Sequence, residues 1–182
     1  NIRGSNWKYD AIQTDYYDAS AITDAFIIFA QDAEFRALSN TTTYADIKRA
    51  YGNLNFNTGI SCRDTETIPL GKDAVLTSTV FHFSEELKTQ KYNYYDRKYE
   101  TFEANDAKLQ KASFTIKMDW RTLAGRKLGG IMDALVGNIK SKYNVLDSET
   151  SNNIAVIETD NILFSLESNE KEKTILVVAK FK

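Results

Sequence analysis

The last three apolar segments of the chain are joined by very short polar connections, and this spacing limits the fold more than any other feature. The segments span residues 154–158, 162–166 and 174–181. Two parallel strands need a crossover of about a dozen residues or more, whereas antiparallel neighbours need only a turn. Residues 159–161 and 168–173 are polar and too few for a crossover, so the spacing predicts an antiparallel meander.

Earlier segments also have the patterns of strands. Residues 113–120 alternate between apolar and polar side chains, so that Phe114 and Thr115 point to opposite faces. Residues 75–83 are rich in β-branched and aromatic side chains, which favour strands. Two less regular strands are expected at residues 55–61 and 92–102.

Three helices are expected, two near the N-terminus and one long helix in the middle of the chain. Apolar side chains recur at helical spacing over residues 20–37. A shorter helix is expected over residues 43–51, where Thr43 and Asp46 have the spacing of a capping box. The longest apolar stripe with helical period covers residues 121–143 and predicts a helix that packs on a sheet.

These elements follow the order α-α-β-β-(β)-β-α-β-β-β, in which strands come in runs and do not alternate with helices. This order predicts an α+β fold, with the two N-terminal helices and the long central helix packed on antiparallel sheet. The chain has one proline and no Gly/Ser-rich linker. We therefore expect a single domain spanning residues 1–182.

Composition argues against several classes of site. The 23 Lys+Arg residues against 25 Asp+Glu give a net charge of -2, whereas a generic nucleic-acid binder has a basic surplus. The single cysteine, Cys62, excludes an intrachain disulfide, and with a single histidine, His82, it cannot build a Cys/His zinc site. We expect no cofactor or metal and no membrane span. Four N-terminal carboxylates lack calcium-loop spacing and are interpreted as a solvated face: Asp10, Asp15, Asp18 and Asp24.

An enzymatic interpretation needs His82 as a general base, with Cys62 as the nucleophile if the two side chains meet in space. Against it, His82 lies inside a strand pattern, on the face opposite its two phenylalanine neighbours, which favours a structural or surface role. The sequence also has no G-x-S-x-G motif to support a hydrolase.

A glycine-rich run at residues 125–130 contains Arg126 and Lys127, and such a run at a helix start is a candidate anion site. It matches neither the P-loop nor the dinucleotide-binding pattern. The structural alternative is that Gly125 and Gly129 let a helix lie close to the sheet, which would offset their cost of about 1 kcal/mol each. A small ligand would bind between this run and the histidine.

The segment 88–99 interleaves basic residues with four tyrosines. This mixture is typical of a protein interface, and it also suits stacking on single-stranded nucleic acid or on a glycan. The alternative is that the tyrosines cover a sheet between solvated lysines. The residues expected to carry a contact surface are Tyr92, Tyr94, Tyr95, Arg97 and Tyr99.

One stretch of the chain resembles a known family. In residues 38–85 a threonine-capped short helix ends in Tyr51-Gly52 and is followed by strand patterns, the last of which ends at Phe83. This arrangement is similar to the small outer-membrane lipoproteins of the SmpA/OmlA (BamE) type. The resemblance implies a periplasmic, non-enzymatic protein that serves as an assembly or interaction partner in the bacterial envelope, and it assigns no functional residue.

The leading hypothesis from the sequence is a non-catalytic binding module of the bacterial envelope or of a secreted setting, with another protein as its partner. The chain begins at Asn1 and not at Met, which is expected after processing in the cell or after trimming. A cytoplasmic location is the alternative. The competing functions are a small-ligand site or enzyme near the histidine, and a nucleic-acid or glycan binder that uses the tyrosines.

Overall fold

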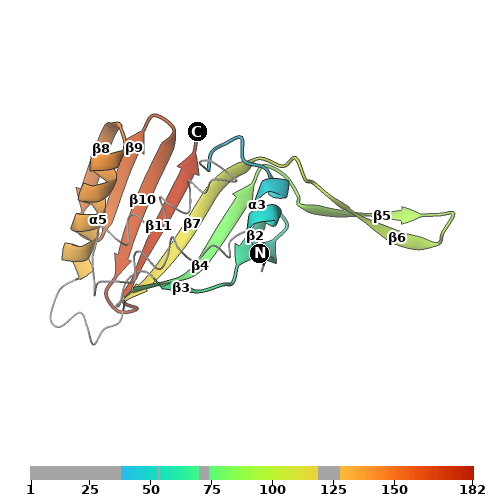
Figure 1. Ribbon diagram of the computed structural model, residues 1–182, viewed down its shortest axis with the longest axis horizontal. Coiled ribbons are helices and arrows are strands. Elements are labelled where there is room, and N and C mark those ends of the chain that lie inside the picture. The colour runs from blue at the N-terminus through green and yellow to red at the C-terminus, as the bar shows by residue number, and fades with distance from the viewer. Residues whose placement is uncertain (1–37, 53, 70–73, 119–127) are drawn as a thin grey trace.

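The structure is a computed structural model that describes residues 38–52, 54–69, 74–118 and 128–182. In these residues a broad, twisted antiparallel sheet forms the body, and a two-stranded ribbon projects from one end of it (Figure 1). The sheet has nine strands in the order β1-β2-β4-β7-β11-β10-β9-β8, and β3 pairs with β4 beside this path.

The strands of the sheet come from both halves of the chain. Their bounds are β1 Leu54–Thr58, β2 Ser61–Asp64, β3 Ile68–Pro69, β4 Ala74–Phe83, β7 Leu109–Met118, β8 Val145–Ser151, β9 Ile154–Thr159, β10 Ile162–Asn169 and β11 Thr174–Phe181. All pairings are antiparallel. The expected meander of the last three strands is therefore confirmed, with β10 between β9 and β11.

The predicted α+β class is wrong, because the described part of the chain is mainly antiparallel sheet with few helices. Three strands were not predicted: β2, β3 and β8. Strand β8 is mostly polar and exposed, so its side chains carry no strand signal, and it forms because its backbone pairs with β9. The expected single strand at residues 92–102 is also wrong, because a turn divides this segment into two strands.

The described helices are α3 Tyr44–Ala50 and α5 Leu128–Lys142. The predicted capping box of α3 is confirmed: the Thr43 hydroxyl accepts a hydrogen bond from the Asp46 N–H at 3.2 Å, and the Asp46 carboxylate accepts one from the Thr43 N–H at 2.9 Å. Helix α5 lies inside the predicted helix at 121–143. The helix predicted over residues 20–37 lies outside the described residues.

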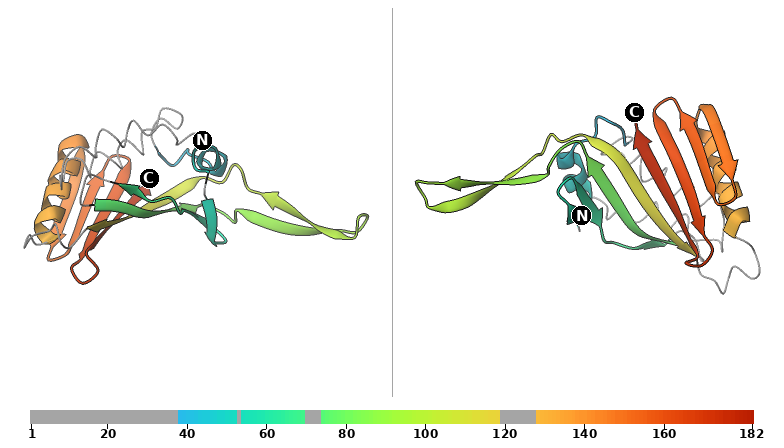
Figure 2. Two further views of the ribbon diagram at one scale, coloured as in Figure 1. Left: turned by 60° about the horizontal axis from the view of Figure 1, so that its bottom comes forward. Right: turned by 180° about the vertical axis from the view of Figure 1, so that it is seen from behind.

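One face of the sheet holds the core. Both helices lie over this face (Figure 2). Directly after α3, Tyr51 contacts Phe81 of β4, with ring centroids 5.0 Å apart. After α5, Tyr143 contacts Phe164 of β10, also at 5.0 Å. The strand registers place Phe81 and Phe164 in one row across the sheet, through the small residues Ala112 and Ala179. We call this side the core face.

The alternate residues of the same strands form the opposite side, which we call the open face. Its middle row is Val156, Ser165, Val178, Ser113 and Val80, one residue from each of β9, β10, β11, β7 and β4. These side chains are half-exposed. No described helix covers this face, and the view from behind shows its strands unobstructed by the described elements (Figure 2).

Candidate functional site: a projecting tyrosine arm

The projecting ribbon consists of β5 Lys88–Asn93 and β6 Lys98–Glu103, and we call it the arm. Its strands pair from Lys88 opposite Glu103 to Asn93 opposite Lys98. They form a separate two-stranded sheet with no other strand beside it in the described part of the chain. A two-stranded hairpin is marginally stable by itself in water, so the local sequence and the base must support the arm.

The turn at the tip is organised by Asn93. The Asn93 side-chain oxygen accepts hydrogen bonds from the N–H groups of Tyr95 and Asp96 at 2.9 and 3.1 Å. The amide group of the same side chain donates to Glu100 at 2.6 Å. Arg97 closes the turn with a φ of 53°, in the left-handed region. The turn lacks the glycine that usually marks such a position, which explains why the sequence pattern did not reveal it.

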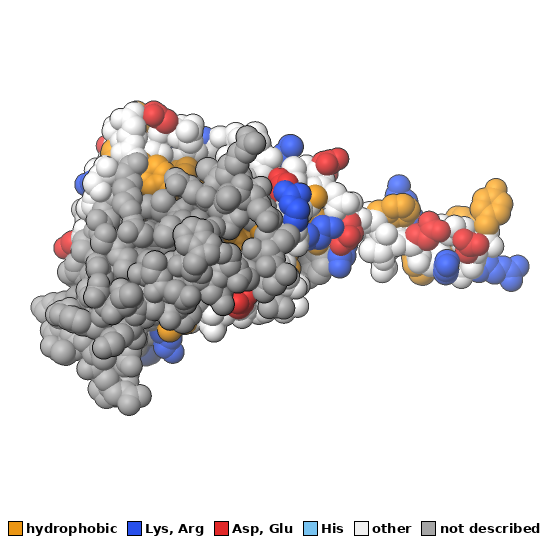
Figure 3. All heavy atoms as spheres, viewed as in Figure 1, with side chains coloured by type: hydrophobic (Ala, Val, Ile, Leu, Met, Phe, Trp, Pro, Cys, Tyr) orange, Lys and Arg blue, Asp and Glu red, His pale blue; other side chains and the backbone are white. Residues whose placement is uncertain are grey.

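Three tyrosines gather on one side of the arm. The Tyr92 ring contacts the rings of Tyr94 and Tyr99 edge to face, with centroids 4.9 and 5.2 Å apart. Tyr94, Tyr95 and Tyr99 are 83%, 99% and 68% exposed, so most of the surface of these side chains faces solvent. Apolar side chains are visible at the outer end of the arm, among charges of both signs (Figure 3).

The other side of the arm carries an aromatic residue that the sequence analysis missed. Phe102 is 48% exposed, and the Lys91 ammonium lies 5.6 Å from its ring centroid. Lys91 also stands opposite Glu100 in the strand register. If residues 92–102 formed a single strand, Phe102 would lie on the same face as Tyr92 and Tyr94, because side chains alternate between the two faces of a strand. The hairpin instead places Phe102 opposite Thr89, on the side of the arm away from Tyr92 and Tyr99.

The base of the arm is fixed to the body. Leu87 is fully buried, and its N–H donates to the Gly59 carbonyl at 2.8 Å. Its own carbonyl accepts from the Ala104 N–H at 2.9 Å. Lys48 of α3 pairs with Glu103 at 3.1 Å, near the end of β6. The arm therefore starts from a rigid root, while its outer part has few contacts.

The two residues of the enzymatic interpretation lie on opposite faces of the sheet. Cys62 pairs with Phe81 and is buried on the core face, whereas His82 pairs with Ser61 and points to the open face. Burial raises the pKa of the Cys62 thiol to about 12, and the nearby Asp64 acts in the same direction. The pKa of His82 is lowered, first by burial and then by the charge of Lys111. The two side chains do not form a nucleophile–base pair.

The candidate anion-site residues Arg126 and Lys127 lie outside the described residues. The four N-terminal carboxylates that were interpreted as a solvated face also lie outside them: Asp10, Asp15, Asp18 and Asp24. Within the residues that the structure describes, no three His, Cys, Asp or Glu side chains group so that they could hold a metal ion. No described helix is both long and apolar enough to cross a membrane.

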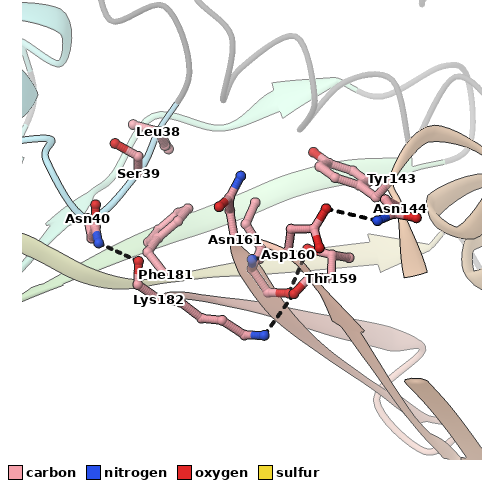
Figure 4. A pocket seen from close by; sticks show the side chains of 11 residues that line it. Leu38, Ser39, Asn40, Tyr143, Asn144, Thr159, Asp160, Asn161, Phe181 and Lys182 are labelled. Carbon is pink, nitrogen blue, oxygen red and sulfur yellow. Dashed lines mark hydrogen bonds between the residues drawn. The ribbon is translucent and has the colours of Figure 1, made fainter. Parts of the chain in front are cut away.

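A hollow of about 430 Å³ lies at the C-terminal end of β11, lined by residues from the segment before α3, the end of α5 and the β9–β10 turn (Figure 4). Its polar groups bond largely to one another. Asn144 donates to Asp160 at 2.9 Å, Lys182 donates to the Thr159 carbonyl at 2.8 Å, and Asn40 donates to the Lys182 carbonyl. This network fastens the end of the chain to the sheet.

No protein-family model, curated protein or solved structure matches this chain. The arm holds all five predicted contact residues at exposed positions in or near its turn: Tyr92, Tyr94, Tyr95, Arg97 and Tyr99. Tyr92, the least exposed of the four tyrosines at 41%, supports the rings of Tyr94 and Tyr99.

Proposed function

We propose that this chain is a non-catalytic binding module whose arm docks onto another protein. The single observation that carries the proposal is the exposure of the clustered tyrosines at the end of a projecting hairpin. Tyrosine is enriched among the residues that dominate the binding energy of protein interfaces. It offers a large apolar ring and a polar hydroxyl at a low cost in side-chain entropy.

The charges of the arm favour a protein over a nucleic acid as the partner. In the strand register Lys88 stands opposite Glu103, and Lys91 stands opposite Glu100. Basic and acidic side chains therefore alternate across the ribbon. A groove that follows a phosphate backbone requires a continuous basic track. A mixed-charge surface around aromatic anchors is typical of the rim and centre of a protein interface.

The setting that we propose is the bacterial envelope or a secreted location. Its support is the sequence pattern of residues 38–85, which resembles small outer-membrane lipoproteins. The described helix α3 and its capping box lie inside this stretch. An interaction arm would serve a protein whose role is assembly or attachment and not catalysis.

The proposal is tested by placing a photo-crosslinking amino acid at position 95 of the full chain, expressed in its source organism. We expect a small number of discrete crosslinked proteins, identified by mass spectrometry. The same proteins should then bind the purified chain, and Tyr94→Ser/Tyr95→Ser should weaken that binding about tenfold or more. The matched control is Thr89→Ala/Thr101→Ala on the same arm, which should leave binding unchanged.

Two results would overturn the proposal. One is a crosslinked partner whose affinity is the same for the tyrosine variant and the threonine control. The other is tyrosine-dependent binding to oligonucleotides or oligosaccharides in the absence of any protein partner, which would show that the exposed rings stack on bases or sugars.

A further inference from the structure

The open face carries an ordered row of charges across six strands. Reading from the β8 edge toward the other side, the register places Asp147 opposite Glu158, Glu158 opposite Leu163, and Leu163 opposite Lys180. Lys180 then stands opposite Lys111, and Lys111 opposite His82. Two carboxylates, one leucine and two lysines thus follow one another on adjacent strands.

This row contains one acidic pair, Asp147 and Glu158, and one basic pair, Lys180 and Lys111. Like charges directly opposite each other on neighbouring strands are destabilising. No described residue forms an ion pair with Lys111 or Lys180. At the acidic end, Glu158 is held by Lys182 at 2.9 Å, whereas Asp147 accepts a hydrogen bond only from the adjacent Ser148 N–H among the described residues. A partner surface would stabilise both pairs if it placed basic groups opposite Asp147 and Glu158 and acidic groups opposite Lys180 and Lys111.

The neighbouring rows of the open face are apolar at matching places. In the middle row, Val156 on β9 and Val178 on β11 flank Ser165 on β10. In the next row, Ile154 on β9 and Leu176 on β11 are 39% and 37% exposed. Across β10, apolar residues on the β9 side therefore correspond to apolar residues on the β11 side. The acidic residues on the β8–β9 side correspond to basic residues on the β11–β7 side.

We propose that the open face binds the open face of a second copy of this chain, across a two-fold axis that runs parallel to the strands above β10. Such an axis reverses the strand order and keeps each row at its own level. Strand β8 of one copy then faces β7 of the other, and β9 faces β11. This operation places both carboxylates of the row opposite lysines of the second copy, whereas a shift by one strand in either direction keeps only one carboxylate opposite a lysine.

The pairing follows directly from the register. Asp147 faces Lys111 of the second copy, and Glu158 faces Lys180. Leu163 and Ser165 each face themselves on the axis, Val156 faces Val178, and Ile154 faces Leu176. This is the isologous contact of a two-fold dimer, in which each residue pair occurs twice. Packed sheets lie about 10 Å apart and align within about 30° of each other, which allows these side chains to meet.

The size of the contact predicts the strength of the dimer. Five strands about 4.8 Å apart, with about five residues of each strand, cover roughly 400 Å² on each copy. The total of about 800 Å² is smaller than a standard specific interface and is typical of weak, transient contacts. Glu167 on β10 would also face itself across the axis, and this contact opposes association. We therefore expect a dimer whose population depends on protein concentration.

The first test is crosslinking from two matched serine positions on the open face. Ser165→Cys places a thiol on the axis, so a short bismaleimide linker should join two copies. Ser113→Cys is the control, because β7 lies two strands from the axis and its two thiols would be roughly 19 Å apart laterally. Cys62 is 1% exposed and does not compete for the reagent. Equal crosslinking at both positions, or none at either, overturns the proposal.

The second test is a charge exchange measured by sedimentation equilibrium. Asp147→Lys and Lys111→Asp alone should each weaken the dimer about tenfold or more, because each creates two like-charge contacts. The double variant should restore the wild-type association, and Glu167→Gln should strengthen it. A wild-type chain that stays monomeric at millimolar concentration overturns the proposal, as does a dimer that is indifferent to these exchanges. Tyr94→Ser/Tyr95→Ser should leave the dimer intact, which separates this test from that of the arm.

Discussion

Cys62 and His82 are neighbours across one strand pair, yet the register of that pair places them in different environments. Burial holds the Cys62 thiol in the neutral form, and among the described residues the charge that acts on its pKa is that of Asp64, which raises it further. The sequence could place His82 opposite its phenylalanine neighbours because that is a local property of any strand. It could not place Cys62 relative to His82, because the pairing of β2 with β4 fixes that relation.

The first prediction concerns the reactivity of Cys62. A folded pKa of about 12 leaves roughly a thousandth of the thiol ionised at pH 9, whereas an unfolded cysteine is about half ionised there. Raising the pH from 7 to 9 should therefore change iodoacetamide labelling of the folded protein little. Labelling in urea should increase strongly over the same range. The measurement is alkylation followed by intact mass, and equal labelling rates for the folded and unfolded chain would contradict the assignment.

At the scale of elements, the arm and β8 show the limits of local patterns. The arm residues were recognisable because tyrosines and basic residues interleave in a short segment. The turn was not recognisable, because Arg97 and not a glycine occupies the left-handed position, and because hydrogen bonds to the Asn93 side chain organise the turn. Strand β8 has no apolar period, and only the exposed backbone of β9 makes it a strand. When a strand forms only because its backbone pairs with a neighbouring strand, its own side chains do not reveal it.

The second prediction concerns the independence of the arm. Replacing residues 90–101 with Asn-Gly should shorten the hairpin to its root and leave the free energy of unfolding within about 1 kcal/mol of wild type, because the removed side chains contact one another and solvent. Urea denaturation followed by tryptophan fluorescence measures this. Leu87→Ala at the buried root is the contrasting variant and should cost about 2–5 kcal/mol. A similar loss in both variants would show that the outer arm packs on the body.

At the scale of the whole molecule, stability should decrease from the centre of the sheet outward. Strands β7 and β11 lie in the middle of the order and are paired on both sides, whereas β5 and β6 pair only with each other among the described strands. Opening a central strand requires the loss of two ladders and of the core, whereas fraying the arm requires neither.

The third prediction is the resulting order of amide hydrogen exchange. Amides of β7 and β11 should exchange most slowly, those of the arm fastest, and those of β8 between them. Exchange measured by NMR or by mass spectrometry at two protein concentrations checks this order. Because β8 faces β7 in the dimer that we propose, higher concentration should slow exchange in β8 and leave the arm unchanged. An arm as protected as β7 would contradict the expected hierarchy.

The sequence by itself determined which side of each long strand is apolar, where α3 begins, and that the last three strands form a meander. These are consequences of periodicity, capping and loop length, which act over a few residues. Only the tertiary structure decided that β7 joins β4 to β11, that a polar segment becomes the edge strand β8, and that the tyrosines stand on a projecting arm. It also aligned Asp147, Lys180 and Lys111 in one row, because residues far apart in the chain become neighbours only through strand register.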